Sequence, residues 1–156
     1  QKSIFIYTLF IYMNKKRVNE DRLLLRPFPQ GIIDDSTRQN LWKKYREDMI
    51  SRAGVSVFLF GNKLVDGKVV LANGMRSEYE IAVDMHNLIV PVGCTGYIAQ
   101  EIWNEINKDL SAYYTHIDDP LKDAFAKLNL KCSNHDLVNN IISFIRLFKN
   151  GKHSPV

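Results

Sequence analysis

The chain has 156 residues and a net charge of +4, and 46% of its residues are hydrophobic while 24% are charged. This balance is typical of one soluble globular domain, and the chain is too short for two domains of ordinary size. Its two cysteines, Cys94 and Cys132, lie far apart and in no metal-like spacing. That argues against a disulfide scaffold and a zinc site, and it favours a reducing, cytoplasmic setting.

The most apolar run, SIFIYTLFIYM at residues 3–13, is too short to cross a bilayer. We expect a buried strand or helix at the domain edge there, and no membrane partner. The one compact basic run, NKKR at residues 14–17, could be a solvated turn or a patch for nucleic acid or membrane. We favour the turn, so we expect no nucleic-acid partner; the basic surplus equally suits a small anionic ligand.

The first strand after that run is predicted at Arg22–Leu25. Pro27 and Pro29 cannot continue a helix or a central strand, so residues 26–31 should form a loop at the strand's end. A helix should follow, with Asp35 or Ser36 as its N-cap and Gly54 as its stop.

The stretch VSVFLF at residues 55–60 is typical of a strand buried on both faces. A helix over 74–87 should turn Tyr79, Ala82 and Val83 inward, and a second apolar strand should follow at 88–93. Further helices are predicted at 95–114, 119–130 and 133–148, the last capped by Ser133 or Asn134.

The alternation of strands and helices predicts an α/β fold with a parallel sheet covered on both faces. Three strands would end in the loops RPFPQG, GNK and PVGCTG. Because the carboxyl ends of parallel strands share one edge of the sheet, that edge is the expected ligand site.

Two of these loops have more than one interpretation. Gly61, Asn62 and Lys63 could form a simple tight turn, or a place where backbone amides and a cation approach a phosphate. In the other loop, Thr95 between Gly93 and Gly96 could be a helix N-cap or part of an anion site.

Two charged helix residues can be explained without a ligand. Arg46 could be a solvated residue paired with a nearby carboxylate. Glu78 could simply favour the start of its helix, or accept hydrogen bonds from a ribose diol.

The stretches LLLRPFPQ, VSVFLFGNK, GMRSEYEIA, LIVPVG and TGYIAQEIW occur in the order and spacing of the SLOG domains of Thoeris antiphage effectors. The chain resembles that family from about residue 12 to residue 148. SLOG domains are related to lysine-decarboxylase-like phosphoribohydrolases, and their Rossmann-like parallel sheet with helices on both faces binds nucleotide-derived ligands. The resemblance thus implies one such domain over residues 1–156.

The resemblance also implies a function. The domain would be the C-terminal regulatory module of a longer cytoplasmic protein whose sirtuin-like domain hydrolyses NAD. Its ligand would be a cyclic ADP-ribose isomer made by a TIR-domain partner protein, with no further cofactor. Binding would reorganise a homo-oligomer, a tetramer containing dimers of SLOG domains, and release the hydrolase.

The family's ligand-contacting residues match Arg46 in KYRED, Lys63 in FGNK and Glu78 in RSEYE. The resemblance implies that Arg46 and Lys63 bind the pyrophosphate and that Glu78 binds a ribose hydroxyl. The remaining candidate ligand residues lie in the three strand-end loops and are Arg26, Phe28, Gly61, Asn62, Gly93, Thr95 and Gly96. We expect no catalytic residue and no metal ligand among them.

Two features depart from the family pattern. The sequence contains no sirtuin-like domain, so we expect that this chain alone does not hydrolyse NAD. The family's first strand and glycine-rich loops have no counterpart in QKSIFIYTLFIYMNKK, so the N-terminal part of the ligand site is expected to be incomplete.

Two alternative functions remain. A nucleoside monophosphate phosphoribohydrolase would need a carboxylate near Thr95, for which Glu101 is the local choice. However, PVGCTGYIAQE lacks the second glycine and the acidic placement of that family's PGGxGTxxE loop. A pure oligomerisation domain would place Trp103, Tyr113 and Tyr114 in an interface.

Overall fold

The computed structural model describes residues 34–150 and 152–156, and the chain divides into two compact units, Gln1–Gly54 and Val55–Val156. The predicted strand Arg22–Leu25 and the apolar run 3–13 lie outside the described residues. The prediction of one domain over the whole chain therefore stays a prediction.

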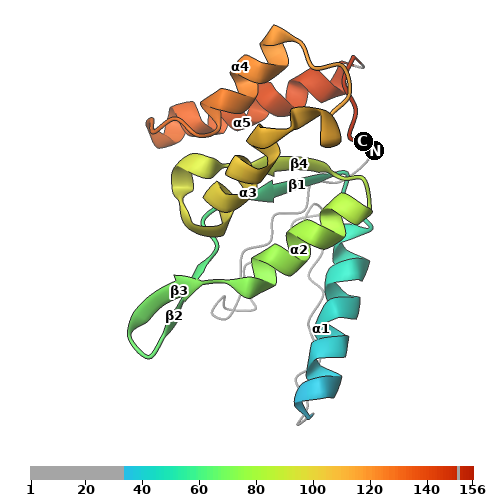
Figure 1. The fold of residues 1–156 in the computed structure, drawn as a ribbon, viewed down its shortest axis with the longest axis vertical. Helices are drawn as coiled ribbons and strands as arrows, with labels where there is room; N and C mark the ends of the chain where they lie inside the picture. Colours follow the sequence, from blue (N-terminus) through green and yellow to red (C-terminus); the bar gives the residue numbers. More distant parts are fainter. Residues whose placement is uncertain (1–33, 151) are drawn as a thin grey trace, which may run out of the picture. The chain divides into compact units, whose positions relative to one another are not determined.

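The described part of the first unit contains the helix α1 (Asp35–Ile50). The elements of the second unit are β1 (Val55–Phe58), β2 (Asn62–Val65), β3 (Lys68–Leu71), α2 (Asn73–Asp84), β4 (Leu88–Pro91), η1 (Gly93–Thr95), α3 (Tyr97–Lys108), η2 (Leu110–Ala112), α4 (Asp119–Lys127) and α5 (Asn134–Lys149) (Figure 1). None of the helices that the structure describes is both long and apolar enough to cross a membrane.

Helix α1 begins one residue earlier than the sequence suggested. Asp34 is its N-cap and accepts a hydrogen bond of 2.9 Å from the Thr37 amide. The predicted caps, Asp35 and Ser36, are wrong: Asp35 is already helical, and the Ser36 hydroxyl donates to the Asp34 carboxylate at 2.6 Å. A carboxylate at the cap position reaches the third amide of the helix, which leaves Ser36 to support it.

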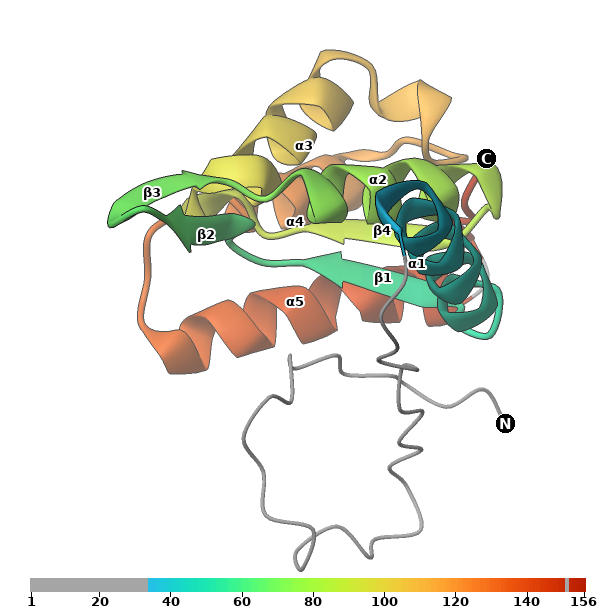
Figure 2. The ribbon, with the colours of Figure 1, turned by 90° about the horizontal axis from the view of Figure 1, so that it is seen from below.

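Strands β1 and β4 pair in parallel, with Val55 opposite Leu88 and Phe58 opposite Pro91. Helices α2 and α3 lie on one face of this pair and α5 lies on the other (Figure 2). The strand–helix–strand connection through α2 is the unit from which Rossmann-like sheets are built. The α/β prediction is therefore confirmed, with helices on both faces.

The prediction that residues 55–60 form one strand buried on both faces is wrong in two respects. Strand β1 ends at Phe58, because the backbone of Phe60 turns into the left-handed region with φ 60°. Phe58 is buried, but Val57 on the opposite face is 38% exposed. Strand β4 matches the expectation, since all four of its residues are buried.

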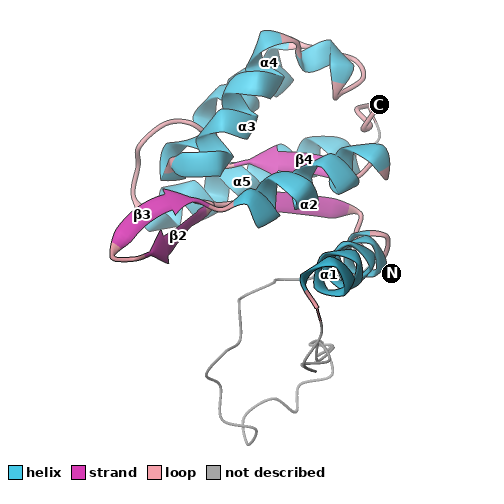
Figure 3. Cartoon of the chain, turned by 60° about the horizontal axis from the view of Figure 1, so that its bottom comes forward, coloured by secondary structure: helices cyan, strands magenta, loops and turns pink. Residues whose placement is uncertain are grey.

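A β-hairpin occupies residues 62–71, where no strand was predicted (Figure 3). Strands β2 and β3 are antiparallel, and Asp66 and Gly67 connect them with φ angles of 50° and 74°. Two consecutive left-handed residues are what a tight two-residue hairpin turn requires, and Asp-Gly is its strongest sequence signal. The interpretation of Gly61–Lys63 as a simple tight turn is therefore wrong, because Asn62 and Lys63 belong to β2.

The predicted helices are present with shifted ends. Tyr79 and Ala82 of α2 are buried as expected, whereas Val83 is only half-buried. Helix α3 ends at Lys108 rather than continuing to residue 114, and the Asp109 side chain then accepts from the Ser111 amide to begin η2. Ser133, and not the alternative Asn134, caps α5.

An aromatic cluster fills the space between β4, α4 and α5. Phe144 contacts Tyr114, Phe125 and Phe148, with ring centroids 5.7, 6.0 and 5.2 Å apart. The Tyr114 hydroxyl donates to the Ile89 carbonyl at 2.9 Å, and burial raises the pKa of this phenol. Offset and edge-to-face ring pairs add stability beyond the area they bury, so this cluster holds the helical layer on the sheet.

Gly61 and Gly67 both have a left-handed backbone, but only Gly61 is also closely packed against other side chains. At Gly61, with φ 94°, a Cβ would lie 2.6 Å from Cβ of Ile98, whereas at Gly67, with φ 74°, it would meet no atom within 4 Å. We expect Gly67→Ala to lower the free energy of unfolding by about 1–2 kcal/mol through conformation alone. Gly61→Ala should lower it by roughly 1–3 kcal/mol more, because the added methyl also overpacks the contact. Urea unfolding of both variants measures the difference, and equal losses would contradict this account of Gly61.

Candidate functional site

The carboxyl ends of β1 and β4 lie side by side, and the chain segments that follow them are joined by hydrogen bonds. The Val92 amide donates to Phe58 at 2.9 Å, which continues the parallel ladder by one step. Beyond it, the Phe60 amide donates to the Thr95 hydroxyl at 2.7 Å, and the Ala99 amide donates to the Phe60 carbonyl at 2.9 Å. The loop after β1 and the start of α3 therefore form one connected structure at the edge where ligands bind in this type of sheet.

Thr95 is not a helix cap, so that interpretation is wrong. Its hydroxyl accepts from Phe60 and donates to the Val92 carbonyl at 2.7 Å, which uses it as a brace between the two strand ends. The N-cap of α3 is Gly96, and no side chain among the described residues caps this helix. The Phe60 carbonyl already binds the Ala99 amide, so in the first turn of α3 the Tyr97 and Ile98 amides are left for water or a ligand anion, which a helix N-terminus favours electrostatically.

Glycine is favoured for different structural reasons at the three glycine positions of this edge. Gly61 is buried, and a Cβ there would also lie 2.6 Å from Sδ of Met75 on α2. Gly93 is buried too, where a Cβ would lie 2.6 Å from Oδ1 of Asn129. Gly96 has φ 80° and open space around it, so its backbone faces a region that a ligand could enter.

Asn62 and Lys63 are exposed and stand at the base of the hairpin. Lys63 is paired across the hairpin with Val70, so it shares one face with Val65, Lys68 and Val70. The opposite face carries Asn62 and apolar side chains. Lys63 is therefore held on a strand, three residues beyond the Phe60–Thr95 brace, and not on a loose loop.

Helix α2 carries Glu78, which is half-buried. Its neighbours on the helix fasten α2 to α3: Arg76 forms an ion pair of 2.7 Å with Glu105, and the Tyr79 hydroxyl donates to the same carboxylate at 2.8 Å. The Tyr113 hydroxyl lies 3.2 Å from Glu105 and completes the cluster. Arg76 and Glu105 were not predicted, and no sequence signal points to their contact, because they lie 29 positions apart.

This cluster shifts the pKa values of Tyr79 and Glu105 in opposite directions. Burial raises the pKa of Tyr79, and its hydrogen bonds to Tyr113 and Glu105 raise it further. At Glu105, burial acts to raise the pKa, but hydrogen bonds from Tyr79 and Arg76 outweigh it and leave the pKa below its usual value. Glu105 is therefore an ionised anchor that holds α2, and with it Glu78, against α3.

The remaining candidates are placed separately. Arg46 lies on α1 in the first unit, with its guanidinium carbon 5.2 Å from the ring centroid of Trp42. Its joint role with Lys63 and Glu78 of the second unit stays a prediction. Arg26 and Phe28 lie outside the described residues.

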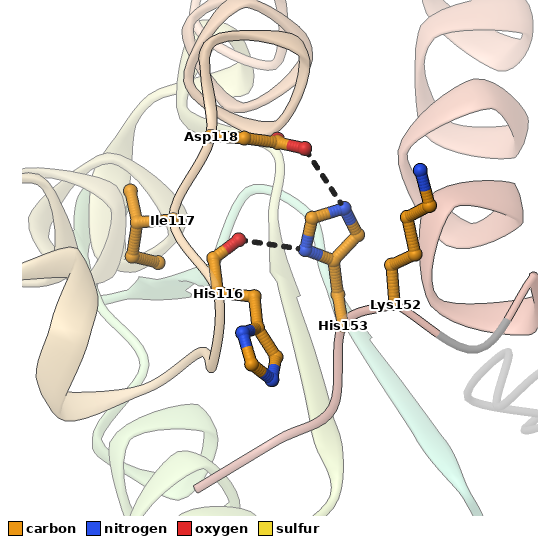
Figure 4. A pocket seen from close by; sticks show the side chains of 5 residues that line it. All are labelled: His116, Ile117, Asp118, Lys152 and His153. Atoms are coloured by element: carbon orange, nitrogen blue, oxygen red, sulfur yellow. Dashed lines mark hydrogen bonds and ion pairs between the residues drawn. The ribbon is translucent and has the colours of Figure 1, made fainter.

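A pocket elsewhere in the second unit contains none of the predicted residues. It is lined by His116, Ile117, Asp118, Lys152 and His153 (Figure 4). His153 is buried, donates from Nδ1 to the His116 carbonyl at 2.9 Å, and has Nε2 3.6 Å from the Asp118 carboxylate. Both ring nitrogens thus hold the C-terminal segment in place, so this pocket is a less suitable ligand site than the strand ends.

The residues invoked for the two alternative functions are used differently from what those functions need. Glu101 lies on α3 but is exposed to solvent, rather than held beside Thr95. Tyr114 is 1% exposed and belongs to the core, so its predicted place in an interface is wrong. The Trp103 indole donates to the Phe125 carbonyl at 3.1 Å and stacks on the Phe125 ring, while Tyr113 bonds to Glu105.

Comparison with known proteins gives consistent matches. The sequence profile of the Sir2- and TIR-associating SLOG family matches residues 5–148. The NAD(+) hydrolase ThsA of Bacillus cereus (strain MSX-D12) is 45% identical over 141 residues, which are 90% of this chain and 29% of that protein. The proteins of the same name from Cytobacillus dafuensis and Acinetobacter baumannii (strain 532279) are 40% and 37% identical, over 92% and 76% of this chain and 29% and 26% of theirs. The chain thus spans less than a third of the length of these relatives.

The lowered pKa of Glu105 predicts an acid-sensitive contribution to stability. Because the folded-state pKa lies below the unfolded one, this contribution is complete above about pH 4.5 and is lost as the pH falls toward the folded-state value. We expect Glu105→Gln to lower the free energy of unfolding at pH 7 by about 1 kcal/mol, a modest loss because the Glu105 side chain is 40% exposed.

The difference between wild type and Glu105→Gln should stay constant from pH 7 to pH 5 and shrink below pH 4.5, as measured by urea unfolding across that range. Glu80→Gln, on the exposed surface of α2, is the matched control and should change little. A difference that grows as the pH falls would contradict the assignment.

Proposed function

Because this chain belongs to the Sir2- and TIR-associating SLOG family, we propose that it is a regulatory sensor that binds a cyclic ADP-ribose isomer and thereby activates an NAD+ hydrolase. The signal would be made by a TIR-domain partner protein. The hydrolytic activity would belong to the rest of a longer antiphage defence protein, since the relatives named as NAD(+) hydrolases are more than three times as long as the matched region.

The observation that carries this proposal is the joined edge at the carboxyl ends of β1 and β4. The Phe60–Thr95 hydrogen bond brings the base of the hairpin close to the start of α3, where no side chain among the described residues caps the first amides. An edge that offers backbone amides and a lysine suits a pyrophosphate, because both are favourable partners for a dianionic group. Glu78 on the adjoining helix supplies a carboxylate that can accept hydrogen bonds from a ribose diol.

The same features support a sensor more than a phosphoribohydrolase. Hydrolysis of an N-glycosidic bond needs a carboxylate fixed near the reacting carbon, with its proton affinity tuned to the reaction. Glu101 is exposed, and Glu105 is bound by Arg76 and Tyr79. The described edge is therefore equipped for holding a nucleotide and less well for cleaving it.

A ligand that binds only the folded state raises the melting temperature by mass action. At a ligand concentration 100 times its dissociation constant, the stabilisation should be about 2.7 kcal/mol, or roughly 5–10 °C for a domain of this size. A thermal-shift series with cyclic ADP-ribose isomers, ADP-ribose and NAD+ measures it, and at least one cyclic isomer should give the largest shift. A cooperative melting transition that none of the cyclic isomers moves would contradict the proposal.

Charge removal tests the site itself. Lys63→Ala and Glu78→Gln should each weaken binding of the stabilising isomer by roughly 10- to 100-fold, the usual effect of losing a hydrogen bond to a charged group. Lys68→Ala is the matched control, because Lys68 lies on the same face of the hairpin but next to its turn. The affinity of the Arg46→Ala variant tests whether the first unit contributes to ligand binding. Calorimetric affinities unchanged in Lys63→Ala and Glu78→Gln would show that the ligand binds elsewhere.

A further inference from the structure

Two aromatic residues at the site edge have an unusual backbone. Phe60 and Tyr97 both lie in the left-handed region, with φ angles of 60° and 55°. That region is uncommon for any residue with a side chain, and it is most strongly disfavoured for bulky ones. The other described non-glycine residues with positive φ are aspartate and histidine, which tolerate it better. Phe60 and Tyr97 are therefore the two positions where side chain and backbone conflict.

Hydrogen bonds hold these two residues next to each other. The Phe60 amide is bound to the Thr95 hydroxyl, and the Phe60 carbonyl is bound to the Ala99 amide. Thr95 and Ala99 stand on either side of Tyr97 in the sequence, so both peptide groups of Phe60 contact the segment that carries Tyr97. The backbone geometry of the pair is thus fixed by the fold, whatever the side chains do.

Both residues are exposed to solvent over about half of their surface. Phe60 is 54% exposed and Tyr97 is 43% exposed. Within the part of the chain that the structure describes, neither ring has a ring contact, either with the other or with another aromatic residue. Glycine would satisfy the left-handed backbone at both positions without conflict. Both aromatic residues are thus substantially exposed although their backbone conformation is disfavoured for bulky side chains.

We propose that Phe60 and Tyr97 form an aromatic platform for the adenine base of the nucleotide ligand. The inference rests on the proposed function and adds to it the part of the ligand that no charged residue would recognise. Every nucleobase has a flat π-face, and exposed aromatic side chains bind it by stacking. Phe60 comes just before the hairpin that carries Lys63 for the phosphates, and Tyr97 directly follows Gly96 with its open backbone. Base and phosphates of one ligand would thus be bound by adjacent parts of the same edge.

The conflict between side chain and backbone gives the test a distinctive signature. Phe60→Gly and Tyr97→Gly remove a ring and also relieve the left-handed strain, so the melting temperature without ligand should stay the same or rise. Affinity for the stabilising cyclic ADP-ribose isomer, measured by calorimetry, should fall roughly 5- to 100-fold in each variant. Phe60→Tyr keeps a π-face and should retain most of the affinity. Leu130→Gly, which removes an apolar side chain that is 57% exposed at another place, is the matched control.

Two further probes separate base recognition from phosphate recognition. AMP and ribose 5-phosphate share the ribose and phosphate and differ by the base, so Phe60→Gly should weaken AMP binding and leave ribose 5-phosphate binding unchanged. If wild type binds a cyclic isomer and the glycine variants bind it equally well, the platform is overturned while the sensor function stands. If the variants change only the association of chains, the rings belong to a protein interface and the platform is likewise overturned. If wild type binds no member of the panel, both proposals fall.

Discussion

The hydrogen bond from the Phe60 amide to the Thr95 hydroxyl determines how the two strand ends are arranged. A short parallel pair such as β1 and β4 fixes where its carboxyl ends lie, but not the path of the chain beyond them. Thr95 fixes that path, because its hydroxyl bonds to Phe60 on one strand end and to Val92 on the other. The Ala99–Phe60 bond then adds the first turn of α3 to the same structure. The hairpin base, the uncapped helix start and the two exposed rings all take their relative positions from these three contacts.

The Arg76–Glu105–Tyr79 cluster provides the second constraint, because it holds α2 beside α3. Tyr79 also packs edge-to-face on Phe58, the last residue of β1, so the cluster fastens the helix that carries Glu78 to this strand end as well. Gly61 connects the two constraints: its backbone packs on Ile98 of α3 and Met75 of α2, where any side chain would separate them. A ligand that contacts Lys63, Glu78 and the start of α3 would therefore touch three elements already fastened to one another. Such preorganisation lowers the ordering cost of binding.

Much of this architecture could be predicted from the sequence, and the failures have definite physical causes. Strand β4 and the helices could be predicted because burial leaves apolar runs and periodicities in the sequence that can be counted. The hairpin was not predicted, although its Asp66-Gly67 turn is a strong local signal, because Gly61–Lys63 was interpreted as a loop at the end of a strand. The role of Thr95 could not be predicted, because its partner Phe60 is 35 positions away. The same holds for Glu105, and for the left-handed backbone of Phe60 and Tyr97, which tertiary hydrogen bonds impose against local preference.

The central claim is that a nucleotide ligand binds where the segments after β1 and β4 meet. Hydrogen–deuterium exchange with and without a saturating cyclic ADP-ribose isomer tests it most directly, because amides that contact a ligand or are closed off by it exchange more slowly. The account predicts slower exchange in both residues 59–63 and residues 95–99, with little change around His116 and His153 in the other pocket. A bound isomer that leaves both segments unchanged, or that protects the His116–His153 pocket instead, would contradict it.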